Sequence, residues 1–244
     1  MSQSLDRGLV ILSALAEESL SLSQISDLLD VHKSTALRLL RVLERNKIVK
    51  HDSDRKYRLG PGLFALATQS VDALEVVPIS KPHLRSLSDE TGLTVHFAEF
   101  DGHDVTYLAK QESRESVRMY SRIGIAAPLH ATAVAKAILA QLPDAELDVI
   151  LRNYKFQKFT DKTITRSSDL LKDIRKVRSV GYSVDNREHE DFVHCIGVGI
   201  QSKSPGAIYG ISLTATTFKT PFKALIEFVP RLKKCASDIA NELI

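Results

Sequence analysis

Apolar residues recur at intervals of three or four through the first part of the chain, which is the period of an amphipathic α-helix. The first run of this kind predicts a helix close to the N-terminus. Its expected buried face is Leu5, Leu9, Leu12 and Ala16. Acidic residues flank the run on both sides, so an ordinary amphipathic helix is a better interpretation than an export signal.

The sequence predicts a second, short helix. Ser21 and Gln24 stand three residues apart, as the two partners of a capping box do. The expected buried face of this helix is Leu22, Ile25, Leu28 and Leu29. Little chain is left for a turn before a third helix begins near His32 or Lys33. Helix, tight turn and helix together predict a helix-turn-helix unit.

After the third helix the period changes to two, which indicates β-strands. Ile48 and Val49 begin one short strand, and Tyr57 and Leu59 alternate with cations in another. The polar turn 52–54 between them completes a predicted two-stranded wing. A turn containing glycine and proline then opens a helical linker. We expect a winged helix-turn-helix over residues 1–61, a linker helix over 62–76 and an α+β domain over 77–244.

Helical and strand patterns alternate irregularly in residues 77–244, which is typical of an α+β domain. Helices are expected over 81–92, 144–152 and 168–180, the first and last closed by Gly92 and Gly181, and a short helix with a tight N-terminal turn is expected within 128–142. Strands are expected over 93–100, 104–110 and 116–124, with a hairpin of 193–201 and 207–216 around a turn at 202–206. A terminal helix should start at Thr220-Pro221 and be kinked by Pro230.

The net charge of the 244 residues is only +3, but the charges are unevenly distributed. Residues 1–31 carry one cation against five acidic residues, a net charge of −4. Residues 32–60 carry nine cations against three acidic residues, a net charge of +6. The positive charge on the third helix and the wing therefore indicates a nucleic-acid partner, which the overall charge does not.

The cysteine content points to a reducing compartment. The two cysteines, Cys195 and Cys235, are too few for a disulfide framework and have no CxxC spacing typical of zinc sites. No uninterrupted apolar segment approaches the roughly 18 residues that a membrane span needs. We expect a cytoplasmic protein that binds no metal or cofactor.

Four stretches of the chain, in the same order and spacing, resemble the IclR-type bacterial transcriptional regulators. They are LSLSQISDLLDVHKSTALRLLRVLERNKIV, YRLGPGLFALA, RIGIAAPLHATAVAKAILA and GYSVDNREHEDFVHCIGVGI. The resemblance covers essentially the whole chain. It implies an N-terminal winged helix-turn-helix that binds double-stranded operator DNA, a GAF-like domain that binds a small-molecule effector, and a homodimer or homotetramer.

Three segments are similar to the KdgR-like members of that family, which respond to sugar acids. They are RMYSRIG, PLHATAVAKAILA and FTDKTITRS. This likeness implies 2-keto-3-deoxygluconate or a related aldonate as the effector. By analogy it also implies a repressor of a catabolic operon.

The third helix has a polar, cationic side opposite its leucines. On a lone helix such a face is usually just solvated, but the capped helix before it and the wing after it favour a surface that reads DNA. A recognition helix presents its N-terminal residues to base edges in the major groove. The expected DNA-binding residues are Lys33, Ser34, Thr35 and Arg38 on this helix, Arg55 and Lys56 at the wing, and Arg7 on the first helix.

The resemblance places the effector at the start of the small-residue helix in HATAVAK, where Ala133 and Val134 match positions whose backbone amides hold the ligand. The polar side chains that match ligand contacts are Asp185, Cys195, Ser212 and Thr214, and Ser121 and Arg122 are further candidates. Residues of these types are more often packing contacts or the polar face of a strand. Together with donors at a helix N-terminus, they suit a small polyol acid.

The chain departs from the family pattern beside these positions. Ala135 stands where glycine is usual, and CIGVGI replaces the usual CIAVPV, so that Gly197 and Gly199 lie in a strand beside the expected pocket. Glycine inside a strand removes a packing side chain, and we expect it to loosen that strand.

Two other classes of protein are open alternatives. An enzyme is one, and REHEDFVH is its best candidate motif, but His189 and His194 are five residues apart rather than the four of a zinc-binding HExxH helix. An acidic loop with incidental histidines is the simpler interpretation. A redox-sensing regulator that works through Cys195 or Cys235 is the other alternative.

Overall fold

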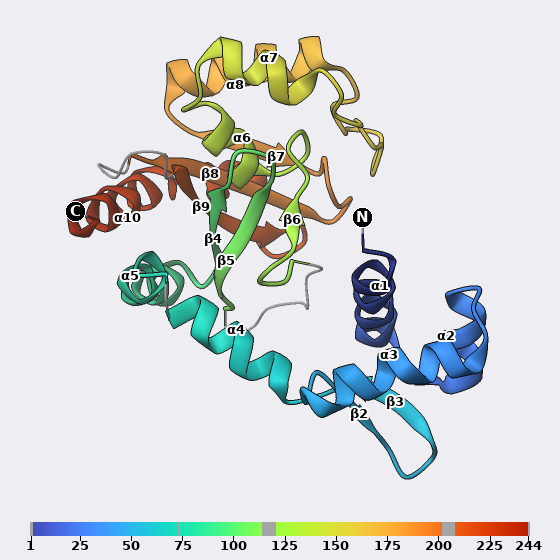
Figure 1. Ribbon diagram of the computed structural model, residues 1–244. Helices are drawn as coiled ribbons and strands as arrows, with labels where there is room; N and C mark the ends of the chain where they lie inside the picture. Colours follow the sequence, from blue (N-terminus) through green and yellow to red (C-terminus); the bar gives the residue numbers. More distant parts are fainter. Residues whose placement is uncertain (1, 73, 114–120, 202–207, 244) are drawn as a thin grey trace. The chain divides into compact units, whose positions relative to one another are not determined.

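The computed structural model describes residues 2–72, 74–113, 121–201 and 208–243. The chain forms two compact units, Met1–Leu74 and Glu75–Ile244 (Figure 1). The first holds a helix-turn-helix with a wing and the second mixes helices with an antiparallel sheet, so the predicted α+β fold class is confirmed. None of the described helices is long and apolar enough to cross a membrane.

The first unit follows the predicted order of elements. They are α1 (Gln3–Glu17), β1 (Leu20–Ser21), α2 (Leu22–Leu28), α3 (Lys33–Arg45), β2 (Val49–His51), β3 (Lys56–Leu59) and α4 (Gly62–Asp72). The strands form an antiparallel sheet in the order β1-β3-β2, in which β1 was not predicted. The predicted capping box is present: the N–H of Gln24 donates to the Ser21 hydroxyl, and the N–H of Ser21 donates to the Gln24 side chain.

The buried face of α1 differs from the predicted one. Leu5 and Leu9 are 66% and 55% exposed, whereas Ile11 and Leu15 are buried. Both sets of residues have helical spacing, so spacing alone could not choose between them. Contacts of α1 with α3 and β3 select Ile11 and Leu15. Leu28 of α2 was also predicted to be buried but is 49% exposed. The spacing of the apolar residues in α2 likewise does not say which of them face the core.

The second unit is a six-stranded sheet with helices on both faces. Its elements are α5 (Val76–Thr91), β4 (Thr94–Phe100), β5 (Val105–Gln111), β6 (Ala126–Ala127), α6 (Ala133–Leu139), α7 (Asp144–Leu151), α8 (Ser167–Val180), β7 (Ser183–Asn186), β8 (Val193–Ile200), β9 (Ile208–Thr216), α9 (Phe222–Ile226) and α10 (Val229–Glu242). The strand order is β6-β5-β4-β9-β8-β7, with antiparallel pairing throughout. α6 covers one face, and α5 and α10 pack together on the other (Figure 1).

Two helices depart from prediction at prolines. α5 begins at Val76 rather than at residue 81 and continues through Pro82. The predicted terminal helix is two helices, α9 and α10, and Pro230 lies in the first turn of α10. A proline there has no helical hydrogen bond to lose, so Pro230 begins a helix instead of kinking one.

The short helix with a tight N-terminal turn that was predicted within 128–142 is present. The turn precedes α6, which begins at Ala133, and in this turn the Thr132 hydroxyl donates to the Pro128 carbonyl. β7 is a further strand that the pattern did not predict. Most of the predicted strand 116–124 and the predicted turn 202–206 lie outside the described residues.

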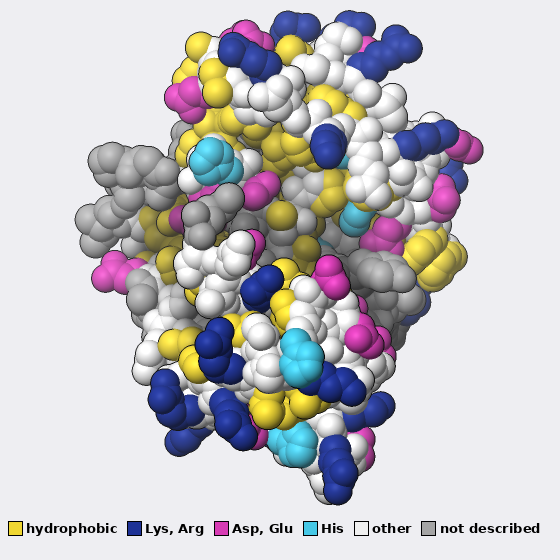
Figure 2. All heavy atoms as spheres, turned by 45° about the vertical axis from the view of Figure 1, so that its right-hand side comes forward, with side chains coloured by type: hydrophobic (Ala, Val, Ile, Leu, Met, Phe, Trp, Pro, Cys, Tyr) yellow, Lys and Arg dark blue, Asp and Glu magenta, His cyan; other side chains and the backbone are white. Residues whose placement is uncertain are grey.

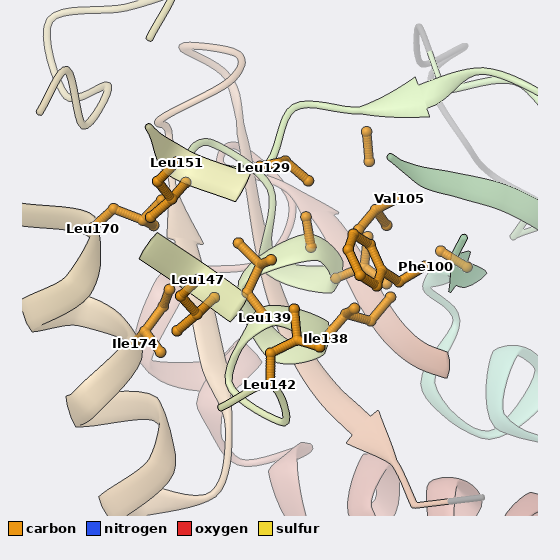
Figure 3. Packing of buried hydrophobic residues seen from close by; sticks show 14 of the residues in the cluster. Phe100, Val105, Leu129, Ile138, Leu139, Leu142, Leu147, Leu151, Leu170 and Ile174 are labelled. Atoms are coloured by element: carbon orange, nitrogen blue, oxygen red, sulfur yellow. The ribbon is translucent and has the colours of Figure 1, made fainter. Parts of the chain in front are cut away.

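A hydrophobic cluster fixes α6 between the sheet and the outer helices (Figure 3). Leu147 of α7 and Leu170 and Ile174 of α8 pack from outside, and Ile138 and Leu139 of α6 lie between them and the sheet. Burying a side chain of this size stabilises the fold by roughly 1.5–3 kcal/mol. The position of α6 over the sheet is therefore set by many such contacts.

Candidate ligand pocket and nucleic-acid interface

Helix α3 presents its cationic side to solvent because its apolar side is held in the core of the first unit. Ala36 and Leu40 are buried with residues of α1, α2 and the wing. His32 caps the helix: the N–H of Ser34 donates to its ring Nδ1, and Ser34 Oγ lies 2.8 Å from the same nitrogen. Of the predicted DNA-binding residues on α3, Lys33, Ser34 and Arg38 are exposed and Thr35 is half-buried.

The wing is closed by a turn that leaves its cations exposed. The N–H of Asp52 donates to the Lys56 carbonyl, and the N–H of Arg55 donates to the Asp52 carbonyl. Arg58 is paired with the Asp52 carboxylate at 2.7 Å, whereas Arg55 and Lys56 extend into solvent. Arg7 of α1 is half-buried. Figure 2 shows lysine and arginine side chains exposed at the lower end of that view and also at its upper end.

A cavity of about 280 Å³ lies in the second unit where α6 meets the sheet. Strands β4, β5, β7, β8 and β9 contribute to its walls, together with the start of α6 and the segment before it. The predicted effector-binding residues that line it are Ser121, Ala133, Val134, Asp185, Cys195, Ser212 and Thr214. Arg122 is exposed and is not among the lining residues. Positions from four separate parts of the sequence therefore meet at one cavity.

The sheet register brings the polar residues of the cavity together. Asp185 lies opposite Cys195, and Cys195 lies opposite Thr214. Ser212 is two residues along β9, hence on the same face, and lies opposite His96. Side chains of facing residues in adjacent strands are about 5 Å apart. The five residues form a continuous polar strip beneath the start of α6.

A chain of polar contacts runs along this strip. Cys195 Sγ lies 3.3 Å from Thr214 Oγ1, which lies 3.3 Å from His96 Nδ1. His96 Nε2 lies 2.7 Å from Ser121 Oγ. Burial, assisted by the nearby Lys110, lowers the pKa of His96 to about 3. The ring is therefore neutral near pH 7, with one nitrogen able to donate and the other able to accept.

Asp185 and Cys195 respond to burial in ways that separate their roles. The Asp185 carboxylate accepts a hydrogen bond from the N–H of Glu188 at 2.7 Å. Burial, with the charge of Glu188 as a second cause, raises the pKa of Asp185 to about 7. Burial, and then the charge of Asp185, raises the pKa of the Cys195 thiol well above its usual value. Near neutral pH the carboxyl can donate or accept a proton, while the thiol stays protonated and unreactive.

Several residues of the cavity were not among the predicted effector positions. They are His96, Tyr107, Ile125, Ala126, Pro128, Thr132, His189, Glu190 and Val193. His189 packs edge-on against Phe159, with ring centroids 4.8 Å apart. Glu190 Oε2 is buried and receives no hydrogen bond from any described residue.

The two histidines of REHEDFVH lie in different surroundings. His189 lines the cavity, whereas His194 does not and contacts the Thr220 carbonyl at 2.7 Å. The one sequence signal for His189 and Glu190 as site residues was their place just before β8.

The glycines of β8 permit a close approach of α6 to the sheet. A Cβ atom at Gly197 would lie 2.6 Å from both the Ala133 carbonyl oxygen and Ser183 Oγ. At Gly199 it would lie 2.5 Å from the Gln141 side chain. β8 remains paired on both sides at Gly197. The glycines were expected to loosen the strand. In the structure they instead leave room for the neighbouring residues to pack closely against β8.

Both parts of the chain match known families. Residues 68–241 match the family described as bacterial transcriptional regulator IclR C-terminal, and residues 4–53 match the IclR helix-turn-helix domain. The chain is 31% identical over 244 residues to the HTH-type transcriptional regulator XynR of Escherichia coli strain K12, covering 99% of this chain and 97% of that protein. It is 31% identical over 235 residues to the HTH-type transcriptional regulator KdgR of the same strain, covering 96% and 89%.

A solved structure shares the whole fold. The crystal structure of the Thermotoga maritima IclR matches with a TM-score of 0.84 at 29% identity, covering 100% of this chain and 99% of that chain. A helix-turn-helix with an exposed cationic helix, combined with a unit that encloses a metabolite-sized cavity, defines a ligand-responsive DNA-binding regulator. The chain belongs to the IclR family of bacterial transcriptional regulators. It is a regulator of transcription and not an enzyme.

Proposed function

We propose that the protein is a repressor of a sugar-acid catabolic operon, released from its operator when a small polyhydroxy acid occupies the cavity of the second unit. The observation that carries this proposal is the convergence of the predicted effector positions on one cavity. The effector we propose is 2-keto-3-deoxygluconate or a related aldonate.

The cavity suits such a ligand in size and chemistry. Its volume of about 280 Å³ is just below the roughly 300–1,000 Å³ of pockets for drug-sized ligands, so it fits a small metabolite. The first backbone N–H groups of a helix have no partner within the helix, and Ala133 and Val134 occupy such positions beside the cavity. These groups would receive the carboxylate. Asp185, Ser212 and Thr214 can exchange hydrogen bonds with hydroxyl groups.

The first unit would read the operator through α3. Lys33, Ser34, Thr35 and Arg38 would meet base edges, and Arg55, Lys56 and Arg7 would contact phosphates. We further propose that the protein acts in the cytoplasm as a homodimer or homotetramer. A two-fold dimer requires an operator with inverted half-sites one helical turn, or a multiple of it, apart.

The coupling between the two functions would run through residues 62–76, which we propose as a linker between a DNA-binding domain at 1–61 and an effector domain at 77–244. Ligand binding can shift an equilibrium only through a difference in affinity for the two states. We propose that the sugar acid binds the state of the effector domain that is incompatible with operator binding.

A thermal-shift screen of sugar acids tests the effector. A ligand that binds only the folded state stabilises it by about 2.7 kcal/mol at a concentration of 100 Kd. We expect 2-keto-3-deoxygluconate to raise the melting temperature and to release operator DNA in a gel-shift assay. The matched control is 2-oxohexanoate, which has the same carbon chain without hydroxyl groups. Asp185→Ala should bind operator yet fail to respond, and normal release in that variant would refute the role of Asp185.

A further inference from the structure

The helix that covers the cavity contains one charged residue, Lys136, and its side chain is only 1% exposed. Its Nζ lies 3.0 and 2.9 Å from the two carboxylate oxygens of Glu188 and 2.8 Å from Asp173 Oδ2 of α8. Burial alone would lower the pKa of Lys136, but Glu188 and Asp173 outweigh it and raise this pKa, so the lysine stays charged. A buried ion pair contributes little net stability compared with apolar packing. Its place beside the cavity therefore calls for another explanation.

Glu188 also organises the turn that follows β7. Its N–H donates to Asp185 Oδ1 at 2.7 Å, and its own carboxylate accepts from the N–H of Asn186 at 3.3 Å. Arg187, which lies between Asn186 and Glu188, has a φ of 65°. This is a left-handed conformation that residues other than glycine rarely adopt. The turn holds the Asp185 carboxyl in one orientation. Through its side chain, Glu188 ties this turn to Lys136.

The same lysine belongs to the helix that forms the opposite wall. Ala133 and Val134 line the cavity about one helical turn before Lys136. The Ser183 hydroxyl of β7 donates to the Ala133 carbonyl, which fixes the start of α6 on the sheet. Lys136 therefore joins two walls of the cavity, the backbone at the start of α6 and the turn that carries Asp185. Neither Lys136 nor Glu188 lines the cavity.

We infer that Lys136 and Glu188 are a positioning pair for the effector site. Their ion pair fixes the Asp185 carboxyl relative to the backbone of Ala133 and Val134, and so sets effector affinity without touching the effector. Groups that are held in the bound arrangement before binding lose less entropy on binding, which is how a distant contact strengthens affinity. This inference rests on the proposed function, because it takes the cavity as the effector site.

The first test compares two carboxylates that share the same lysine. Glu188→Gln keeps the size of the side chain but removes the charge next to the turn. Asp173→Asn removes the other partner of Lys136, on α8 and outside the turn. Calorimetric titration of the full chain with 2-keto-3-deoxygluconate should show about tenfold weaker binding for Glu188→Gln and less than about a threefold change for Asp173→Asn. Equal losses, or no loss for Glu188→Gln, would overturn the inference.

The second test separates positioning from general weakening of the fold. If Glu188 acts through Asp185, then Glu188→Gln should change the affinity little when Asp185 is already Asn. Residues that act through one another show such non-additive effects, whereas independent effects add. An equal loss of affinity in both backgrounds would therefore count against a positioning role.

The third test needs no ligand. The N–H of Glu188 is bonded to Asp185, so its hydrogen exchange reports on the turn. We expect exchange about tenfold faster in Lys136→Met than in the wild type or Asp173→Asn. Should Lys136→Met fail to fold, Glu188→Gln serves for the same measurement. Unchanged exchange would overturn the inference even if no sugar acid binds. Faster exchange in a protein that binds no sugar acid would support the positioning pair and refute only the proposed effector.

Discussion

Asp185 of β7 and Cys195 of β8 are direct register partners, so a buried carboxyl faces a half-buried cysteine across two strands. Burial, and then the charge of Asp185, raises the pKa of the Cys195 thiol. The arrangement favours the protonated thiol over the thiolate, which is the reactive form.

We therefore predict that the protein is not a peroxide sensor. Burial, and then the charges of Asp238 and Glu90, raises the pKa of the other thiol, Cys235, to about 12. Operator binding measured before and after treatment with hydrogen peroxide should be unchanged. Alkylation by iodoacetamide at pH 8 should be slow for the folded protein and fast after unfolding. Rapid alkylation of the folded protein, or loss of operator binding on oxidation, would favour the redox alternative.

The pKa of Asp185 predicts a pH dependence of stability. Its value is about 7 in the folded protein, against an ordinary value of 3.8. Folding thus favours the protonated form, so this contribution to stability is fully present below pH 3.8 and is lost as the pH rises towards 7. As the pH rises from 4 to 7, the free energy of unfolding measured in urea should fall less for Asp185→Asn than for the wild type. Asp191→Asn, an exposed carboxylate of the same loop, is the control. Parallel curves for wild type and Asp185→Asn would contradict this prediction.

Glu190 should reduce the stability of the ligand-free protein. Its side chain is only 15% exposed, and its Oε2 lacks a hydrogen-bond donor among the described residues. A buried polar group without a partner costs about 1–3 kcal/mol. Glu190→Met should therefore raise the melting temperature measured without ligand. Glu99→Met is the matched control. Glu99 accepts a hydrogen bond from Tyr209, so this substitution should lower the melting temperature of the protein. A lower melting temperature for Glu190→Met would show that Glu190 has a partner in the folded protein.

Two glycines should respond in opposite directions to substitution by alanine. Gly197→Ala would place a Cβ atom 2.6 Å from the Ala133 carbonyl oxygen, and overpacking of this kind typically costs about 1–3 kcal/mol. Gly8 of α1 has no atom within 4 Å of the added Cβ, so Gly8→Ala should stabilise its helix by about 0.5–1 kcal/mol. Denaturant unfolding measures both. A neutral Gly197→Ala would mean that α6 can move away from β8.

The two kinds of DNA contact should be separable by substitution. Arg38→Ala should cost about 1–3 kcal/mol and relax the preference at one base position. Lys56→Ala should weaken binding to all sequences and reduce the slope of affinity against salt by about 1. Fluorescence titration against operator and mutated operators at several salt concentrations measures both effects. The control is Arg152→Ala, an exposed arginine at the end of α7. Normal binding by both variants would refute the assignment of this surface.

The sequence by itself determined the features that depend on local spacing. The capping box at Ser21, the tight turn before α3, the wing and the glycine caps at Gly92 and Gly181 follow from residue types only a few positions apart. The order of its motifs also determined the family. These predictions succeeded because short-range hydrogen bonds and turn conformations need no information about distant parts of the chain.

Only the tertiary structure decided which of several equivalent faces is buried and which distant residues meet. Leu5 and Leu9 have the same helical spacing as Ile11 and Leu15. Contact of α1 with α3 and β3 buries the second pair and leaves the first exposed. Glu188 and Lys136 stand far apart in the sequence, and no local pattern relates them. Strand register and the packing of α6 on β8 bring them within hydrogen-bond distance. Such pairs depend on long-range packing, which residue periodicity does not encode.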